Sequence, residues 1–277
     1  MKKIICLLVT MILLVCATAS AADTYGGYNI PLDIAVNGCF VKCSQKPIII
    51  GGTTYIPLRA FSDAVGGAIS WDAGRKLAVL EKGGHYFEFY PNQGSCWIDG
   101  VLKPYNSVLY ANLTFVPVRA ISETLGYGVS WDDFYLVVNI SAPGVVVPDY
   151  YRDYSYTYED ILYLGKITQI ESGYEPFAVQ LGVADVVVNR MKSSKFPNTV
   201  KGVILDKKYG VQFPPAHTSQ FDVTPTKSCI IAAKCALRGI NVVGNSLYFI
   251  DKQAASYSWA AKNRPYFGTI HSMNFYE

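Results

Sequence analysis

Charge and histidine are scarce in this sequence. Of its 277 residues 16% are charged, 24 Lys+Arg stand against 21 Asp+Glu, and three are histidine. A balance so close to neutral excludes the strongly basic surface that nucleic-acid binding requires. The histidines are scattered and no two cysteines have CxxC spacing, so the sequence offers no metal-ligand set. We therefore expect no metal, no cofactor and no nucleic-acid partner.

Long hydrophobic runs are absent after the first 22 residues, which excludes a multi-pass membrane protein. The opening segment has two lysines, an apolar run over Ile4–Ala17 and small residues up to Ala21, the pattern of a secretory signal peptide over residues 1–21. Its removal from the 277 residues would leave 256, with a net charge of +1 and no membrane span. A lipoprotein anchor at Cys16 is disfavoured because Leu14-Val15 precede it. We expect a secreted protein associated with the cell wall or the spore.

Cysteines are few, and their number in the mature chain is odd. Five remain after the predicted cleavage site: Cys39, Cys43, Cys96, Cys229 and Cys235. At least one cannot pair within the chain. The spacing permits one bridge among the first three, whereas the last two lie six residues apart in an expected helix and point to different faces. Apolar content of 51%, with 14% aromatic residues, excludes a disordered chain.

An internal repeat dominates the first half of the chain. TYIPLRAFSDAVGGAISWD at residues 54–72 recurs 60 residues later as TFVPVRAISETLGYGVSWD at residues 114–132. Each unit predicts a strand, a short helix that begins at a proline (Pro57, Pro117) and stops at a glycine (Gly66, Gly126), and then another strand. Upstream, Asn37-Gly38 and Asp99-Gly100 indicate matching hairpin turns.

The doubled unit resembles the copper amine oxidase N-terminal-like stalk domain of secreted Gram-positive proteins, over residues 28–141. The resemblance implies a β-rich α+β domain that acts as a stalk or contacts wall polymers. Despite the family name it implies no copper, since the unit holds one histidine, His85. Arg59 and Arg119 recur in the two units, and we interpret them as structural arginines that anchor each unit.

A break follows the repeat. Residues 142–157 contain prolines, a glycine and a tyrosine-rich polar stretch, which indicate a linker. From residue 158 to 277 the hydrophobic period changes to about 3.6. It predicts helices that end near Ser172-Gly173, run from Ala178 to about Lys192, and run over Lys227–Leu237 after a Thr226 cap. Tyr248–Ile250 and Thr269-Ile270 are expected as short strands. This half is therefore predicted to be mainly helical with a small sheet.

Glu171 has the physical setting of a catalytic acid. It follows an apolar stripe in the last turn of its helix, and the negative end of a helix dipole disfavours an ionised carboxylate. Partial burial would act in the same direction. A carboxyl group that stays protonated near neutral pH is what a general acid in glycoside cleavage requires. On spacing alone, an exposed carboxylate at a helix end is the favoured interpretation of Glu171.

The segments around Glu171 resemble the SleB-type cell wall hydrolases, a family that includes spore-cortex-lytic enzymes. The resemblance rests on IESGYEPF at residues 170–177, on VADVVVNRMKSSKFPNTVKGV at residues 183–203, and on Gln212-Phe213 and Ser246–Phe249. It implies cleavage of peptidoglycan glycan strands in a lysozyme-like or lytic-transglycosylase-like fold. The family's catalytic glutamate falls on Glu171 and its second acidic position on Glu175.

The chain departs from the family pattern at two places. Ser172-Gly-Tyr174 replaces the usual Ala-Arg-Gly, and Met273 stands where the family has a histidine. His271 is two residues away, which on a strand keeps the side but not the position. Further substrate-binding candidates are Glu175, Gln212, Phe213, Tyr248 and Trp259, the last two through aromatic faces that suit sugar rings. Asn189-Arg190 is interpreted as tying down the following loop.

Taken together, the sequence predicts an α+β protein with a repeated stalk domain, a linker and a cell wall hydrolase domain. The expected activity is that of a peptidoglycan glycosidase, with Glu171 as general acid and peptidoglycan glycan strands as partner. A lytic transglycosylase needs one carboxylate and a hydrolase needs two, and the sequence leaves both open. A non-catalytic wall or spore-coat binding protein is the alternative, supported by Met273 and the altered spacer.

Overall fold

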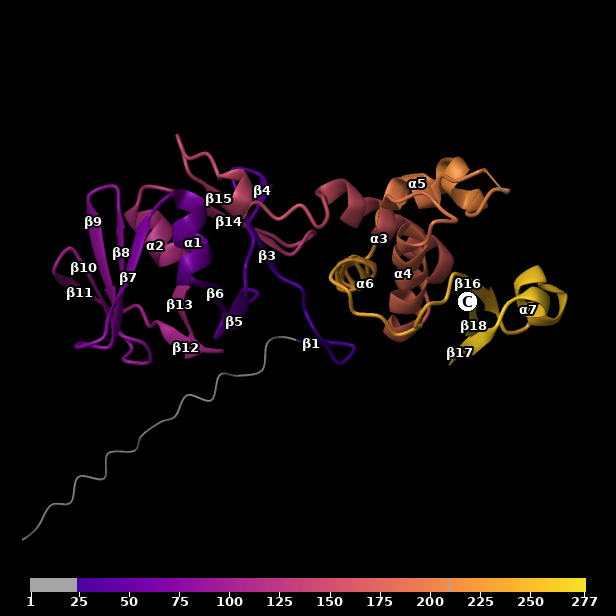
Figure 1. Ribbon diagram of the computed structural model, residues 1–277, viewed down its shortest axis with the longest axis horizontal. Helices are drawn as coiled ribbons and strands as arrows, with labels where there is room; N and C mark the ends of the chain where they lie inside the picture. The colour runs from indigo at the N-terminus through magenta and orange to yellow at the C-terminus, as the bar shows by residue number, and fades with distance from the viewer. Residues whose placement is uncertain (1–23, 209) are drawn as a thin grey trace, which may run out of the picture.

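The computed structural model describes residues 24–208 and 210–277; the signal peptide expected at residues 1–21 lies outside them. A β-rich N-terminal half, indigo to magenta in Figure 1, lies beside a mainly helical C-terminal half that carries a small sheet. The predicted α+β fold class is confirmed. No helix among the described residues is long and apolar enough to cross a bilayer.

The two repeats meet in a central sheet. Its order is β12-β13-β6-β5, formed by β5 (Ile48–Ile50), β6 (Thr53–Pro57), β12 (Val108–Tyr110) and β13 (Leu113–Pro117). β6 and β13 pair antiparallel, with Ile56 opposite Val116. Because these residues are equivalent in the repeat, an approximate twofold axis relates the units. The strand that begins one unit therefore lies beside the helix and strands of the other.

Each unit adds a helix and an outer sheet. The helices are α1 (Leu58–Val65) and α2 (Val118–Thr124). The first outer sheet is antiparallel in the order β11-β10-β9-β8-β7: β7 (Ala68–Asp72), β8 (Leu77–Lys82), β9 (His85–Phe89), β10 (Cys96–Ile98) and β11 (Val101–Lys103). The second has the order β14-β15-β3-β4: β3 (Asp33–Val36), β4 (Cys39–Phe40), β14 (Gly128–Asp132) and β15 (Val137–Ser141). Here β3 runs parallel to β15, so a strand from the start of the N-terminal half pairs with the strand at its end.

The predicted turns form. Asn37-Gly38 joins β3 to β4 and Asp99-Gly100 joins β10 to β11, and all four residues have positive φ, as a tight hairpin turn requires. The helix-stopping glycines are confirmed, since Gly66 and Gly126 have φ of 69° and 73°. The prolines differ from expectation. Pro57 and Pro117 are cap residues that end β6 and β13, and the helices begin one residue later.

Three long helices form the core of the C-terminal half. They are α3 (Tyr158–Ser172), α4 (Phe177–Lys192) and α6 (Lys227–Leu237), which contact one another and bury their apolar faces together. The bounds of α6 are as predicted, and the Thr226 side chain accepts a hydrogen bond from the Cys229 amide. The shorter helices are α5 (Val200–Ile204) and α7 (Trp259–Asn263). The small sheet has the order β16-β18-β17: β16 (Tyr248–Asp251), β17 (Tyr266–Ile270) and β18 (Met273–Tyr276). In Figure 1 this sheet and α7 lie at the end of the molecule away from the N-terminal half.

A buried ionic cluster joins the two halves. Asp33 of β3 accepts from Tyr156 and from Arg238, and its carboxylate lies 3.0 Å from the Lys234 ammonium of α6. Lys234 is fully buried and also donates to the Leu136 carbonyl at 3.0 Å. Burial disfavours the Asp33 carboxylate, but Lys234 and Arg238 outweigh it and lower its pKa. The halves are thus joined by charges that are largely shielded from water.

The segment expected as a linker, residues 142–157, is attached to the rest of the molecule at several points. Ala142, Val147 and Tyr156 are buried, and the Asp153 amide donates to the Phe40 carbonyl at 2.8 Å. The five described cysteines are free thiols, so the bridge that the spacing permitted does not form. Three of them (Cys39, Cys43 and Cys96) pack on the N-terminal core, where they act as small apolar side chains.

Candidate active site

Glu171 lies at the end of α3, where the chain turns toward α4. The turn is held by Gln180 of α4, whose amide nitrogen donates to the carbonyls of Gly173 at 3.3 Å and Glu175 at 3.0 Å. A Cβ on Gly173 would lie 2.4 Å from the backbone carbonyl oxygen of Gln169, so this position requires glycine. Local packing therefore fixes the backbone on both sides of Glu171.

The Glu171 side chain is half-buried, and burial raises its pKa above the ordinary value for glutamate. The charge of Arg190 opposes this shift without cancelling it. The position near the negative end of α3 acts in the same direction as burial. The environment thus favours the protonated carboxyl, which is the form that donates a proton in general acid catalysis.

Arg190, in the last turn of α4, is the cation whose charge acts on the pKa of Glu171. Its guanidinium lies 5.0 Å from the ring centre of Phe196, 5.1 Å from that of Phe213 and 5.6 Å from that of Tyr248. Nε donates to the Leu247 carbonyl at 2.8 Å, but Nη1 is buried without a hydrogen-bond partner. A buried, unpaired guanidinium nitrogen is costly, and burial lowers the pKa of Arg190 to about 10. Arg190 contacts the loop that follows α4 through the Phe196 ring, but its hydrogen bond goes to the segment before β16, and its charge acts on Glu171.

A second arginine extends the aromatic layer, the group of rings that Arg190 contacts (Phe196, Phe213 and Tyr248). Arg264 lies 5.3 Å from the ring centre of Tyr248 and 4.8 Å from that of Trp259, and its Nε is buried without a partner. The two rings meet edge to face at 6.0 Å. Trp259 is 57% exposed, so one face of its indole is open to a ligand. No sequence pattern selects Arg264, because Tyr248 and Trp259, the rings that it contacts, belong to separate elements, β16 and α7.

Glu175 pairs with His271 across the site. The histidine Nδ1 lies 3.0 Å from the Glu175 carboxylate, with the histidine in the turn between β17 and β18 at a φ of 51°. Met273, in the family's histidine position, is instead half-buried against the cluster around Val243 and Phe275. The shift of two residues therefore carries the imidazole to the Glu175 loop.

The remaining predicted residues divide between surface and core. Gln212 is half-buried, and its side chain donates to the Gly210 carbonyl at 3.3 Å. Phe213 is 2% exposed and packs against Arg190 and Phe249, so it supports the site from below the surface. Arg190 thus brings Glu171, Phe213 and Tyr248 together, and Trp259 joins through Tyr248. Glu175 lies on the adjoining turn.

Asp185, one turn before Asn189 in α4, binds its proton more tightly in the folded chain than in the unfolded chain. It is 2% exposed; one carboxyl oxygen accepts from the Val242 amide at 2.7 Å and the other has no partner. Burial raises its pKa to about 7, against a small opposing contribution from the Val242 amide and Lys192. Asn189 holds the same loop by donating to the Gly244 and Ser246 carbonyls.

We expect Asp185 to make the protein less stable as pH rises from about 4 to 7. In that window the unfolded chain has released the proton and the folded chain retains it, so the free energy of unfolding falls, by on the order of 4 kcal/mol in total. Asp185→Asn should flatten this dependence while keeping the acceptor for Val242. Urea unfolding at pH 4.5, 6 and 7.5 measures it, with exposed Asp222→Asn as control. Parallel profiles for wild type and Asp185→Asn would contradict the assignment.

Metal ligands do not gather in the described ranges, 24–208 and 210–277: no group of three His, Cys, Asp or Glu side chains is placed to hold an ion. What the candidate site offers is one half-buried carboxyl, two arginines and aromatic faces. This set suits proton transfer to a bound, ring-shaped polar ligand.

Comparison with known families separates the two halves. Residues 174–276 match the family model described as Cell Wall Hydrolase, and residues 35–140 match the Copper amine oxidase N-terminal domain. Each half of the chain thus matches the model of the family that it was expected to resemble. The first match begins three residues after Glu171, so it does not extend to that residue.

Curated relatives of the chain are spore cortex-lytic enzymes. The enzyme of Bacillus cereus is 34% identical over 104 residues, which are 38% of this chain and 39% of the relative. That of Oceanobacillus iheyensis is 31% identical over 117 residues, 42% and 40% respectively. The chain thus spans about two fifths of their length. Among solved structures, the catalytic domain of the germination-specific lytic transglycosylase SleB from Bacillus anthracis is 31% identical, with 47% of this chain and all of that one covered and a TM-score of 0.41.

Proposed function

We propose that this chain, whose C-terminal half is a cell wall hydrolase domain, is a secreted enzyme that cleaves the glycan strands of peptidoglycan. Glu171 is the general acid. The observation that carries the proposal is a half-buried carboxyl with a raised pKa at the end of α3, beside Arg190 and exposed aromatic faces. The similarity to spore cortex-lytic enzymes supports peptidoglycan of the wall or spore cortex as substrate.

The reaction follows from this arrangement. Glu171 donates its proton to the glycosidic oxygen as the bond to the anomeric carbon breaks. The carboxylate so formed is stabilised by the charge of Arg190, which lies close enough to lower its pKa. The exposed indole of Trp259 holds a sugar ring, with Tyr248 packed beside it. The same carboxylate then accepts a proton from the attacking hydroxyl, which returns it to its initial state.

Glu175 favours the single-carboxylate route. Its carboxylate is engaged by His271 at 3.0 Å, whereas a second catalytic acid must be free to attack or to activate water. We therefore propose that the substrate's own C6 hydroxyl attacks the anomeric carbon and closes an anhydro ring, as in a lytic transglycosylase. Hydrolysis, in which water attacks, is the alternative and leaves a reducing end.

The test is incubation of purified protein with cell-wall or cortex peptidoglycan and mass spectrometry of the released fragments. Fragments with anhydro ends are expected. Fragments with reducing ends would show that the enzyme is a hydrolase and not a transglycosylase. No release by wild type, together with retention on insoluble peptidoglycan, would contradict the enzyme and identify a non-catalytic wall-binding protein.

Glu175→Gln is expected to raise KM several-fold and to change kcat little, because we assign Glu175 and His271 to substrate binding. The measurement is the rate of fragment release at varied peptidoglycan concentration, with Glu159→Gln on exposed α3 surface as the matched control. A loss of kcat by a factor of about 100 or more would identify Glu175 as a second catalytic carboxylate and favour hydrolysis.

A further inference from the structure

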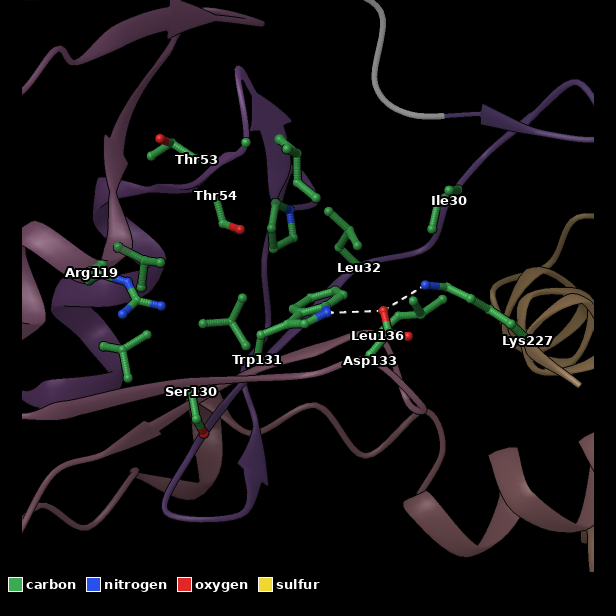
Figure 2. A pocket seen from close by; sticks show the side chains of 16 residues that line it. Ile30, Leu32, Thr53, Thr54, Arg119, Ser130, Trp131, Asp133, Leu136 and Lys227 are labelled. Atoms are coloured by element: carbon green, nitrogen blue, oxygen red, sulfur yellow. Dashed lines mark hydrogen bonds and ion pairs between the residues drawn. The ribbon is translucent and has the colours of Figure 1, made fainter. Parts of the chain in front are cut away.

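A pocket of about 520 Å³ lies where the N-terminal half meets α6, within the range of small-molecule sites. Figure 2 shows the Trp131 indole between Arg119 of α2 and Lys227 of α6. The indole nitrogen donates to Asp133, and Asp133 pairs with Lys227 at 2.6 Å. Hydroxyl groups of Thr53, Thr54 and Ser130 also line the pocket. It combines an aromatic face, hydroxyls and a cation.

A second, shallower pocket of about 170 Å³ lies on the other repeat unit. Its lining includes Arg59, Ser70, Trp71 and Thr114. The Trp71 side chain is 54% exposed, compared with 40% for Trp131. The first pocket is larger because residues at the junction with the C-terminal half, such as Leu32 and Leu136, add walls to it.

The two pockets are built from equivalent residues. The repeat offset of 60 relates Arg59 to Arg119, Ser70 to Ser130, Trp71 to Trp131, and Thr54 to Thr114. Each pocket takes its arginine, serine and tryptophan from one unit and its threonine from the other, because β6 and β13 pair antiparallel about the twofold axis. The duplication thus produced two copies of one site.

The arginines are available to a ligand, contrary to our interpretation of them as structural anchors. The Arg119 side chain is 63% exposed, and its pairing with Glu123 is loose, at 3.8 Å on the open surface. Such pairs contribute little. Arg59 is exposed, and its attraction to Asp63 includes no hydrogen bond in the described part of the chain. Neither side chain holds the fold, yet both line a pocket.

We propose that these two pockets are twin binding sites for the disaccharide-peptide units of peptidoglycan. A sugar ring packs its apolar face on Trp71 or Trp131, hydroxyls of Ser and Thr bond its polar groups, and a carboxylate of the unit pairs with Arg59 or Arg119. The inference rests on the proposed function for the nature of the polymer. It assigns the N-terminal half the task of holding the strand that the C-terminal half cleaves.

The charge of each pocket indicates a ligand with one anionic group. Lys227 is neutralised by Asp133, so each pocket presents one arginine to one anionic group. A protein with so small a net charge does not adhere to the wall by general attraction, and needs discrete sites. Two sites on one rigid domain also match a repeating polymer, because simultaneous occupation raises the apparent affinity without new contacts.

The test uses the full chain with Glu171→Gln, so that ligand is not consumed, and titration calorimetry with a purified soluble muropeptide. We expect three muropeptides per chain, one at the candidate active site and one in each of the two pockets. Trp71→Ala or Arg59→Gln should weaken binding to one pocket, and Trp131→Ala or Arg119→Gln binding to the other, each raising the Kd of its site about 10- to 100-fold. Retention on insoluble peptidoglycan stripped of other wall polymers should fall more steeply than muropeptide affinity when either site is lost.

Trp97→Ala is the matched control, since Trp97 is 38% exposed on β10 outside both pockets. Thermal unfolding verifies that each variant is folded. One muropeptide per chain, binding unaffected by the four variants, or preference for a poly(glycerol phosphate) chain would each overturn the assignment. Because binding is measured without cleavage, such a failure is distinct from failure of the proposed enzyme, which is judged by fragments released by wild type.

Discussion

Replacing Glu171 by glutamine is expected to lower the rate of glycan cleavage about 10²- to 10⁴-fold, the usual contribution of a general acid. Glutamine has the shape of the protonated carboxyl and no proton of comparable acidity, so binding survives and proton transfer does not. The turn held by Gln180 stays in place.

The measurement is fragment release from peptidoglycan by equal amounts of wild type, Glu171→Gln and Glu159→Gln, with retention on the insoluble polymer as a check of binding. The control removes a carboxylate from the first turn of the same helix, where it pairs with Lys201 on the surface. A Glu171→Gln protein that retains more than about a tenth of the wild-type rate would remove Glu171 from the mechanism.

The second large effect is expected for Asp33→Ala, which should lower the free energy of unfolding by about 3–5 kcal/mol. Its carboxylate is 6% exposed and offsets two buried cations, Lys234 and Arg238. Without it, Lys234 remains fully buried and uncompensated, although burial already lowers its pKa to about 8. Loss of its proton in the variant would recover part of that energy at high pH.

Chemical unfolding at pH 7 and pH 9 measures the effect, and the loss should be smaller at pH 9. Asp133→Ala is the control, because Asp133 also pairs with a lysine of α6, Lys227, but at the exposed surface where ion pairs contribute little. Equal destabilisation by both variants would show that the buried cluster does not hold the two halves together.

Much of the fold could be predicted because its rules are local. The repeat, the Asn-Gly and Asp-Gly turns and the glycine stops of α1 and α2 depend on backbone geometry within a few residues. The threonine cap and apolar stripe of α6 gave its bounds. The bridge permitted among Cys39, Cys43 and Cys96 failed because spacing in sequence does not measure separation in a folded core.

The side chains that surround Glu171 could be predicted only in part. Glu171 was selected by its place at a helix end. The aromatic layer around Arg190 and Arg264 joins α4, β16 and α7, and no sequence pattern places those side chains together. His271 reaches Glu175 because the turn between β17 and β18 folds back onto the loop after α3, a contact between residues far apart in sequence.

By itself, the sequence determined the two kinds of domain, their order, the duplicated unit and the acidic residue at the end of its helix, because each depends on near neighbours along the chain. The tertiary structure decided which side chains share a surface. It placed Asp33 against Lys234, exposed the arginines of the repeat, and made each pocket from both units. These outcomes depend on the antiparallel pairing of β6 with β13 and on the packing of α6 against β3 and β15, contacts that form between distant segments when the chain closes its core.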